Sequence, residues 1–523
     1  MQPYSLHYND KDLDCEIDAL EAPASMLFGT ATCGYQAEGG FNGPDQPKNN
    51  WYHFEASGKK ERTGASSRFI ELYEQDFDVA ASMGCNAFRM GIEWARIQPS
   101  YDPEDRREPP LDQDALDTYA AVFAACMQRG MTPVVTLFHF THPLWLGLDF
   151  WLMGDEGVDR FRRYAEAAVT KINERLISKH NAPPLKIIIT INEPTMIAMS
   201  TYMLRLFPRG RRNVGLRQAI RSLENQHLAH AHAYRAIHRV YRDHGWPSPQ
   251  VTTNGWCGHL YEFDMLAQDL FLAKAHGVSE EDVPAYLESR RASHYSLLAE
   301  APPRRDFPRL RALLDARLSR RMARIFGRRP YPRLIEFIYG DDAIDRFLDV
   351  VSFDFYDPFL ANYFDLNPPS LRIRPDQWGV VPESLGGFLR SYSEAAGDLP
   401  IMIVENGMSY RHADGRAHPR PDGALRPDVL KAHLYEVIKS LNEGIRLQGY
   451  FYWTMVDNYE WGSFEPRFGL FGVDYEQQAA RMPTDVFGNN TGGLYRAFIN
   501  ALATMDVAAL KTVFRTNDFD LLF

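Results

Sequence analysis

The sequence predicts an α/β protein built as a single (β/α)8 TIM barrel, with a long helical insertion between strands 5 and 6. Three observations support this fold. Apolar, strand-like runs recur along the chain, amphipathic stretches separate them, and neither a Gly/Ser-rich linker nor a change of composition divides the 523 residues. We therefore expect residues 1–523 to form one domain around one closed sheet.

The strand-like runs are rich in β-branched and other apolar residues, as expected for parallel strands that are buried on both faces. We place them at 26–32, 86–92, 132–139, 186–192, 250–254, 349–356, 401–405 and 449–453. Helical spacing of apolar residues is clearest between them at 73–83, 114–129 and 158–178. This alternation of strand and helix is the pattern of a barrel in which every strand is parallel to its neighbours.

The bulk composition limits the class of protein and its partners. Hydrophobic residues make up 45% and charged residues 24%, as in soluble globular proteins, and no stretch reaches the roughly twenty apolar residues that span a bilayer. The net charge of −11 gives no support to nucleic-acid binding. Residues 1–10 lack the pattern of a secretory signal, and the five scattered cysteines contain no CxxC pair. We therefore expect reduced thiols, no zinc site and a cytoplasmic location.

The interval between the fifth and sixth strands, residues 256–348, is much longer than one crossover helix requires. Part of it combines apolar residues at helical spacing with many arginines: Arg304, Arg305, Arg309, Arg311, Arg317, Arg320, Arg321, Arg324, Arg328, Arg329 and Arg333. A basic amphipathic helix of this kind can contact an acidic partner, an anionic lipid surface or an acidic patch of its own protein. A solvated helix over the barrel, or a subunit contact in a homo-oligomer, is the favoured alternative to membrane contact.

Two short segments far apart in the chain point to the chemistry. TINEP at 190–194 and IVENG at 403–407 each run from apolar strand residues into a glutamate, Glu193 and Glu405. Because barrel enzymes build their active sites at the C-terminal ends of the strands, both carboxylates should reach one mouth. Such a pair is what acid/base and nucleophilic work on a glycosidic bond requires. The alternative is two unrelated glutamates, each paired with a lysine or arginine.

Further motifs at the strand ends occur in a fixed order. They are FGTATCGYQAEG at 28–39, NAFRMGIEWARI at 86–97, TLFHF at 136–140 with PLW at 143–145, GYFYWTMVDNYEW at 449–461, and RFGL at 467–470. Together with the two glutamate segments, this ordered set closely resembles glycoside hydrolase family 1, the β-glucosidase-like retaining enzymes. The resemblance covers residues 26–475.

The resemblance implies a role for each glutamate. Glu193 matches the general acid/base, which must be protonated near neutral pH to donate to the leaving oxygen. Glu405 matches the nucleophile, and Arg89 and Tyr356 match the residues that hold it. We expect Arg89 and Tyr356 to lower the pKa of Glu405, and burial with the Glu405 charge to raise that of Glu193. A purely structural ion pair is the alternative for Arg89.

The same motifs imply a sugar-binding pocket at the mouth. The family positions that hydrogen-bond sugar hydroxyls are matched here by Gln36, His139, Asn192 and Glu460. The family positions that form the aromatic floor and wall of the pocket are matched by Trp453 and Trp461. Taken singly, the histidine and the tryptophans would be ordinary core residues, but their common location favours binding. Family members that act on 6-phosphorylated sugars replace the region of Glu460 with a Ser and Lys cluster. A carboxylate there would repel a phosphate, so a non-phosphorylated sugar is favoured.

Several positions depart from the family pattern and bear on which substrate fits. Asp354 stands where the sixth-strand motif usually has asparagine, which brings a further carboxyl near the mouth and can alter aglycone contacts or the pH optimum. The other departures are Phe140 in place of a common tryptophan, Thr141 with His142, Glu93 in place of a serine, and a shortened loop at 463–466 that contains Glu465.

We expect a retaining β-glycosidase, most closely a β-glucosidase, that hydrolyses small-molecule, non-phosphorylated β-glycosides. No cofactor and no metal are expected, because carboxylates supply both the proton transfer and the nucleophile. A transglycosidase that passes the glycosyl group to a sugar or lipid hydroxyl is one alternative, with weak support from the basic insertion and the apolar residues 519–523. A non-catalytic sugar-binding barrel is the other, and the presence of both glutamates disfavours it.

Overall fold

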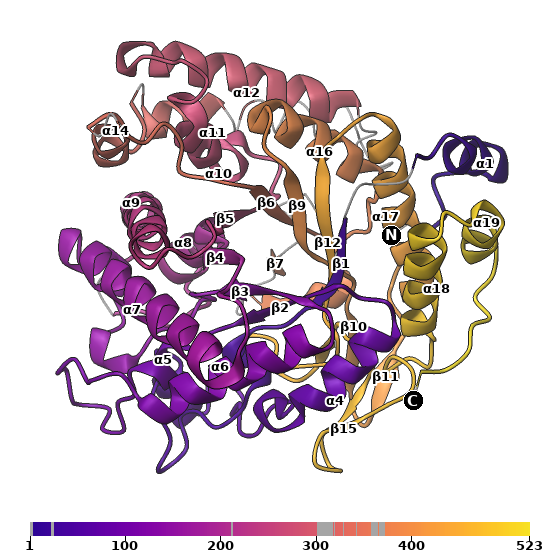
Figure 1. Ribbon diagram of the computed structural model, residues 1–523, viewed down its shortest axis with the longest axis horizontal. Coiled ribbons are helices and arrows are strands. Elements are labelled where there is room, and N and C mark those ends of the chain that lie inside the picture. Colours follow the sequence, from indigo (N-terminus) through magenta and orange to yellow (C-terminus); the bar gives the residue numbers. More distant parts are fainter. Residues whose placement is uncertain are drawn as a thin grey trace.

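Eight parallel strands form a closed barrel in the order β1-β12-β9-β6-β5-β4-β3-β2, and helices surround it (Figure 1). The structure, a computed structural model, describes residues 4–21, 26–210, 213–300, 317, 320–327, 329–340, 343–356, 364–365 and 372–522. The barrel strands are β1 (Leu27–Ala31), β2 (Ala87–Gly91), β3 (Thr132–Thr136), β4 (Ile187–Asn192), β5 (Gln250–Trp256), β6 (Val351–Phe355), β9 (Ile401–Asn406) and β12 (Leu447–Trp453). Each coincides with a predicted run, so the predicted (β/α)8 barrel is confirmed.

Crossover helices connect the strands on the outside of the barrel. The three predicted helices are α4 (Phe69–Ser82), α6 (Gln113–Gln128) and α7 (Asp155–His180). The other long helices are α9 (Leu216–Asp243), α12 (Val283–Glu300), α16 (Glu383–Ala396), α17 (Arg426–Asn442) and α18 (Thr491–Ala503). Short helices at the strand ends are α2 (Gly34–Ala37), α3 (Tyr52–Ala56), α5 (Trp94–Ile97) and α8 (Pro194–Ala198), which continues as a π-helical turn at Met199–Met203. Single 3-10 turns lie at Leu144–Leu146, Phe150–Leu152, Glu280–Asp282 and Pro375–Gln377.

The barrel strands bury side chains on both faces, which explains why they read as continuous apolar runs. Inside the barrel, a cluster of buried residues comprises Ala31, Cys33, Ala87, Val134, Ile187, Ile189, Val350, Met402, Val404, Phe451, Trp453 and Phe468. Side chains on the other face pack against the helices in a larger core. Because all strands are parallel, their C-terminal ends meet at one rim of this packed interior.

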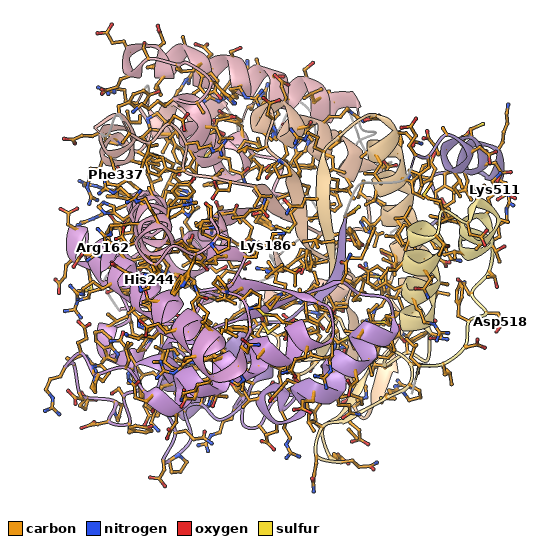
Figure 2. The ribbon with its side chains drawn as sticks, viewed as in Figure 1. Arg162, Lys186, His244, Phe337, Lys511 and Asp518 are labelled. Atoms are coloured by element: carbon orange, nitrogen blue, oxygen red, sulfur yellow. The ribbon has the colours of Figure 1, made fainter. Side chains whose placement is uncertain are left out.

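The described part of the segment between β5 and β6 contains several helices. They are α10 (Tyr261–Asp264), α11 (Leu266–Ala273), α12 and α14 (Pro332–Tyr339). Helix α12 packs against α16, and α14 packs against α9 (Figure 1). Figure 2 shows Phe337 of α14 above α9, where its ring stacks on that of His232 at a centroid distance of 4.1 Å.

Much of the arginine-rich run, including Arg304, Arg305, Arg309, Arg311 and Arg328, lies outside the described residues. At its end, Arg329 forms an ion pair with Glu280, and Arg333 pairs with Asp155 and donates to Asn225 Oδ1 at 2.6 Å. These two arginines thus contact acidic residues of the same protein, which is one of the predicted alternatives. No helix in the described ranges is long and apolar enough to cross a bilayer.

The two ends of the chain lie on the same side of the barrel (Figure 1). Helix α1 (Asp10–Asp18) packs against α19 (Val507–Arg515), where Lys511 forms an ion pair with Asp18 at 2.7 Å (Figure 2). Near the C-terminus, Phe519 and Leu522 are partly buried against the core. The apolar C-terminal segment is therefore not wholly presented to solvent, which weakens its suggested role in lipid contact.

Several short strands lie in the connections after β6, β9 and β12. Strands β10 (Tyr410–Ala413), β11 (Arg416–His418) and β13 (Pro466–Arg467) form one sheet. The pairs β7 (Phe364–Asp365) with β8 (Arg372–Ile373), and β14 (Val473–Asp474) with β15 (Ala480–Arg481), form two more. That residues 1–523 form one domain stays a prediction.

Candidate active site

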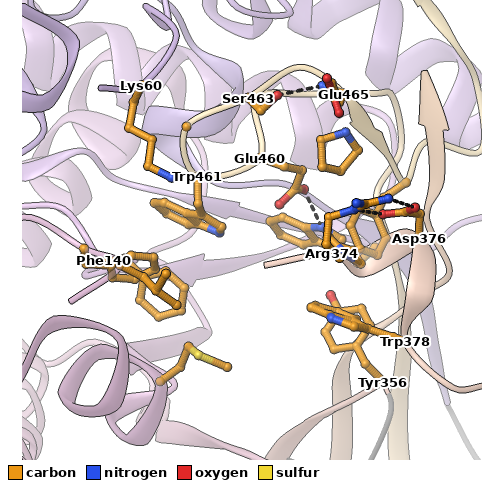
Figure 3. Close-up of a pocket in the computed structure, with 18 of the residues that line it drawn as sticks. Lys60, Phe140, Tyr356, Arg374, Asp376, Trp378, Glu460, Trp461, Ser463 and Glu465 are labelled. Atoms are coloured by element: carbon orange, nitrogen blue, oxygen red, sulfur yellow. Dashed lines mark hydrogen bonds and ion pairs between the residues drawn. The ribbon is translucent and has the colours of Figure 1, made fainter. Parts of the chain in front are cut away.

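The C-terminal rim of the barrel holds a cavity of about 460 Å³. Figure 3 shows Phe140 and Trp461 on one side of it, Tyr356 and Trp378 on the other, and Glu460 between them. Glu193 and Glu405 also line the cavity. Two glutamates distant in the sequence therefore reach one mouth, as the strand-end pattern predicts.

The local backbone explains how the two glutamates are presented. Glu193 follows β4 directly and caps α8, with a positive φ of 41° that turns the chain from strand into helix within one residue. Pro194 then supplies a φ suited to the first helical position. Directly after β9, a Cβ at Gly407 would lie 2.1 Å from the Trp453 carbonyl oxygen, so only glycine permits this approach to β12.

Glu405 is held by two donors. Arg89 Nη1, from β2, donates to Oε1 at 2.6 Å, and the Tyr356 hydroxyl donates to Oε2 at 2.8 Å. Both Arg89 and Glu405 are buried. Each oxygen of the Glu405 carboxyl thus has a donor of its own, and Arg89 provides a positive charge beside it.

A third carboxyl completes a cluster. One oxygen from each of Glu193, Asp354 and Glu405 lies within 4.8 Å of the other two. This spacing would also allow the three groups to share a metal ion. Among the described residues, no other cluster of histidine, cysteine or carboxylate side chains has such a spacing. The Arg89 guanidinium already provides a cation in the cluster, 3.9 Å from Asp354. We therefore assign no metal to it.

The environment separates the protonation of the two glutamates. Burial, and then the charge of Glu405, raise the pKa of Glu193 well above its usual value, as predicted. Burial also raises the pKa of Glu405, although the Arg89 charge and the hydrogen bonds from Tyr356 and Arg89 lower it. Arg89 and Tyr356 thus lower the pKa of Glu405 as predicted, but desolvation, which the prediction for Glu405 left out, outweighs both donors. Glu193 nevertheless carries the larger upward shift, so a proton is held there more readily.

Asn192 connects the carboxyl cluster to His139. Its Oδ1 accepts hydrogen bonds from Arg89 Nη2 at 2.5 Å and from Asn254 Nδ2 at 2.8 Å. The amide nitrogen must then face the other way, toward His139 Nε2 at 3.4 Å. Burial and the Arg89 charge lower the pKa of His139 well below its usual value, so the ring is neutral and its Nε2 accepts.

The predicted aromatic residues gather around His139. Its ring stacks nearly parallel to Trp453 and Trp461, at centroid distances of 5.6 and 5.9 Å. Trp453 Nε1 donates to Glu460 Oε1 at 3.2 Å, and burial in the cavity raises the pKa of Glu460 to about 8. These residues form a wall of ring faces with polar atoms at its edge, an arrangement suited to a sugar.

Gln36 is buried beside this wall, in the short helix α2 that follows β1. The Cys33 thiol donates to Gln36 Oε1 at 2.9 Å, which fixes the orientation of the amide. The backbone carbonyl of Gln36 accepts from the Tyr459 amide at 3.0 Å. Since Tyr459 directly precedes Glu460, these contacts tie the ends of β1 and β12 together.

Two departures from the family pattern contact each other. The Thr141 hydroxyl lies 2.7 and 2.8 Å from the two oxygens of Glu93. Burial and then the nearby Glu38 charge raise the pKa of Glu93 to about 8, although the Thr141 hydrogen bond opposes the rise. The two substitutions are thus explained together, since the threonine provides a donor for an otherwise buried carboxyl.

Some residues of the site were missed from the sequence. One of them is Asn254, the last residue of the fifth predicted strand. A polar residue at the C-terminal end of a barrel strand is typical of an active site, so this position could have been recognised from the sequence. Further apolar residues that line the cavity are Met196, Leu206, Phe207, Trp256 and Trp378. Of these, Trp256 ends β5 and the others lie beyond the barrel strands, where no strand periodicity marks them.

A closed (β/α)8 barrel with buried paired glutamates and a polar, aromatic pocket at its C-terminal mouth has the architecture of a barrel glycosidase. The model of glycosyl hydrolase family 1 matches residues 20–254 and 364–488, more than half of the chain. The chain therefore belongs to glycosyl hydrolase family 1, and it is an O-glycoside hydrolase.

Individual relatives are distant but match along most of their length. Beta-glucosidase A of Thermotoga maritima is 27% identical over 87% of this chain and 94% of its own. The 6-phospho-beta-galactosidase 1 of Streptococcus pneumoniae is 26% identical over the same shares. Among solved structures, a beta-glycosidase from Pyrococcus horikoshii is similar, with a TM-score of 0.61 and 24% identity over 92% of this chain and 96% of its own. This structural likeness supports the fold.

Proposed function

We propose that this protein is a retaining β-glycosidase, most closely a β-glucosidase, that hydrolyses non-phosphorylated β-glycosides by double displacement. The observation that carries the proposal is that a carboxylate oxygen of Glu193 lies within 4.8 Å of one of Glu405. Inverting enzymes keep their two carboxyls about 6.5–9.5 Å apart to admit a water, whereas retaining enzymes have them about 5–5.5 Å apart. The compact cluster supports direct attack by one carboxylate on the sugar.

The first step forms a glycosyl-enzyme. A Glu405 oxygen attacks the anomeric carbon and the bond to the aglycone oxygen breaks, while Glu193 transfers its proton to that oxygen. The raised pKa of Glu193 keeps this proton in place near neutral pH. Arg89 and Tyr356 hold the Glu405 carboxyl, and their hydrogen bonds oppose the rise of its pKa.

The second step releases the sugar. Glu193, now a carboxylate, takes a proton from a water molecule as that water attacks the anomeric carbon and displaces Glu405. Two inversions at one carbon give a product with the β configuration of the substrate. Both glutamates then return to their starting protonation states, and no cofactor takes part.

The pocket residues would divide the recognition of the glycone between them. Polar atoms that can meet sugar hydroxyls come from Gln36, His139, Asn192 and Glu460, and the Trp453 and Trp461 rings offer faces for the C–H surface of the sugar. Asn192 is fixed by Arg89 and Asn254, so its amide is pre-oriented before substrate binds.

Glu460 supports the choice of a non-phosphorylated sugar. Above its raised pKa of about 8 its carboxylate would repel a phosphate dianion, and below that pH the neutral carboxyl provides no positive charge to bind one. The similarity to a 6-phospho-beta-galactosidase makes this a point to test. The test uses a panel of aryl β-glycosides with gluco, galacto, fuco, manno and xylo sugars, together with aryl 6-phospho-β-glucoside. We expect the aryl β-glucoside, or another non-phosphorylated member of the panel, to be hydrolysed at least about tenfold faster than the 6-phospho compound. This ratio corresponds to a difference of about 1.4 kcal/mol in activation free energy. Initial rates of aryl release measure this. Faster hydrolysis of the 6-phospho compound would contradict the assignment.

Transglycosylation is a second candidate, supported by apolar residues that line the cavity, among them Met196, Phe207 and Trp378. Such residues would hold an acceptor with apolar surface in the place that the aglycone leaves. Product analysis with an added acceptor alcohol separates the two activities. A transglycosidase would form mainly the alkyl glycoside, whereas a hydrolase would release mainly free sugar.

A further inference from the structure

Asp354 is the carboxyl of the cluster that has no part in the double displacement described above. It lies on β6, is fully buried, and faces Glu405 across the parallel pairing of β6 with β9. One of its oxygens lies within 4.8 Å of both Glu193 and Glu405. The residue also stands where the resembling family usually has asparagine, so its charge requires an explanation.

The hydrogen bonds of Asp354 are incomplete for an ionised carboxylate. Asn254 Nδ2 donates to Oδ2, but Oδ1 accepts no hydrogen bond from any donor in the described ranges. Arg89 Nη1 is 3.9 Å from Oδ1 and donates instead to Glu405 at 2.6 Å. A buried carboxylate oxygen without a donor is costly, whereas a proton placed between two carboxyls satisfies both.

Charges from every neighbouring strand act on this pair. Asp354 and Glu193 face the Glu405 carboxyl of β9 and the Arg89 guanidinium of β2. Among the residues that the structure describes, the other titratable neighbours are Tyr356, Cys257 and Tyr392, whose pKa values are all raised well above their usual values by burial, so they are neutral. Within this described set, three carboxyls share the Arg89 cation, and proton binding reduces the excess negative charge.

We propose that Asp354 and Glu193 share a proton, and that Asp354 acts as a positioning residue that keeps the acid/base of the proposed glycosidase protonated to higher pH. The inference rests on the proposed function. Burial and the charges of Glu405 and Glu193 raise the pKa of Asp354 well above its usual value. The interaction between the two carboxyls raises the pKa of Asp354 further and lowers that of Glu193, so the two groups compete for one proton that either can carry, and the pair titrates as a unit.

The proposed cycle balances in protons and charge. Before reaction, Glu405 carries one negative charge and the pair, with one proton, carries another. When Glu193 gives that proton to the leaving oxygen, the charge of the pair changes from −1 to −2. In the same step Glu405 becomes a neutral ester, so its charge changes from −1 to 0. The total charge of the three groups is unchanged. Water then returns a proton to the pair as Glu405 is released as carboxylate.

Asp354→Asn tests the proposal, because asparagine can still accept from Asn254 and donate to Glu193 but cannot share a proton. Loss of the last proton from the pair leaves two adjacent carboxylates, whereas loss from Glu193 beside asparagine leaves only one. The pKa of Glu193 should therefore fall, and the basic limb of kcat/KM against pH should move to lower pH by about one unit or more. An aryl β-glucoside serves as substrate, over a pH range in which the variant stays folded.

Asp349→Asn is the matched control. Asp349 lies two residues before β6, at the opposite end of the barrel, and is bonded to Tyr234 and His238 at 2.9 and 2.8 Å. Its substitution should leave the basic limb in place. Asp354→Ser provides a second non-titrating variant if the asparagine variant does not fold, and its basic limb should also move to lower pH.

The outcomes are distinguishable. Failure of the wild-type protein to hydrolyse any β-glycoside would overturn the proposed function, and this inference with it. A wild-type bell-shaped profile whose basic limb stays unmoved in a folded Asp354 variant would overturn the shared proton alone. A shift in the Asp354 variants, without one in Asp349→Asn, supports it.

Discussion

Glu405→Gln is expected to lower kcat on aryl β-glycosides by on the order of 10⁴-fold or more, because an amide cannot attack the anomeric carbon to form the glycosyl-enzyme. The fold should persist. The amide oxygen can replace Oε1 as acceptor from Arg89, and the amide nitrogen can donate to the Tyr356 hydroxyl that now donates to Oε2. Steady-state kinetics and thermal unfolding of the purified variant measure the two effects separately.

The matched control for this variant is Glu443→Gln. Glu443 is exposed at the end of α17, just before β12 begins and so at the end of the barrel opposite the mouth, and it pairs with Arg390 at 3.3 Å. Its kcat should stay close to that of the wild type, since surface ion pairs contribute little. Near-normal turnover by folded Glu405→Gln would contradict the assignment of the nucleophile.

Glu193→Ala is expected to affect substrates according to their leaving groups. An aglycone that leaves poorly needs a proton from Glu193, so its hydrolysis should fall by about 10²–10⁴-fold. A strongly activated aryl aglycone leaves without that proton, so formation of the glycosyl-enzyme should be much less affected. For such substrates the basic limb of kcat/KM should also disappear, since that limb reports loss of the Glu193 proton as pH rises through its raised pKa.

Azide gives a second readout for the same variant. With no general base at position 193, the glycosyl-enzyme accumulates because water is not activated. Azide needs no general base, so it should attack the anomeric carbon, raise the turnover of activated substrates and yield the β-glycosyl azide. An equal loss for all leaving groups, together with no rescue and no azide product, would argue against the acid/base role of Glu193.

The barrel was predictable because its strands are buried on both faces. Such strands read as short apolar runs, and each of the predicted runs coincides with a barrel strand, with ends that differ by a few residues. The short strands β7, β8, β14 and β15 were not predicted, since two residues cannot show a period. The arginine-rich part of the insertion was recognised by composition, but its role stays a prediction.

The site was predictable only in part. Strand-end glutamates and the family motifs bring Glu193, Glu405, Arg89 and Tyr356 together, and the structure places all of them at one mouth. The lowering of the Glu405 pKa by Arg89 and Tyr356 was predicted, but not the larger rise caused by burial, because the cost of burial depends on depth. Contacts among the departures were also missed, since the pairing of Thr141 with Glu93 depends on how neighbouring strand ends meet.

Asp354 illustrates the same limit. The sequence marks it as an unusual carboxyl near the mouth, but not the group that it contacts. Its place beside Glu193 follows from the register of β6 against β5 and β9, in which Asp354 pairs with Trp256 and Glu405. A shift of one residue in that register would turn the carboxyl to the other face of the sheet.

The anomeric form of the first sugar released tests the central claim most directly. An aryl β-glucoside is hydrolysed by the wild-type protein in an NMR tube, and the anomeric proton is followed before mutarotation equilibrates the product. Retaining double displacement by Glu405 and Glu193 predicts that the β-anomer appears first and the α-anomer later. Initial release of the α-anomer would contradict the two-glutamate mechanism, since a single displacement would then have occurred.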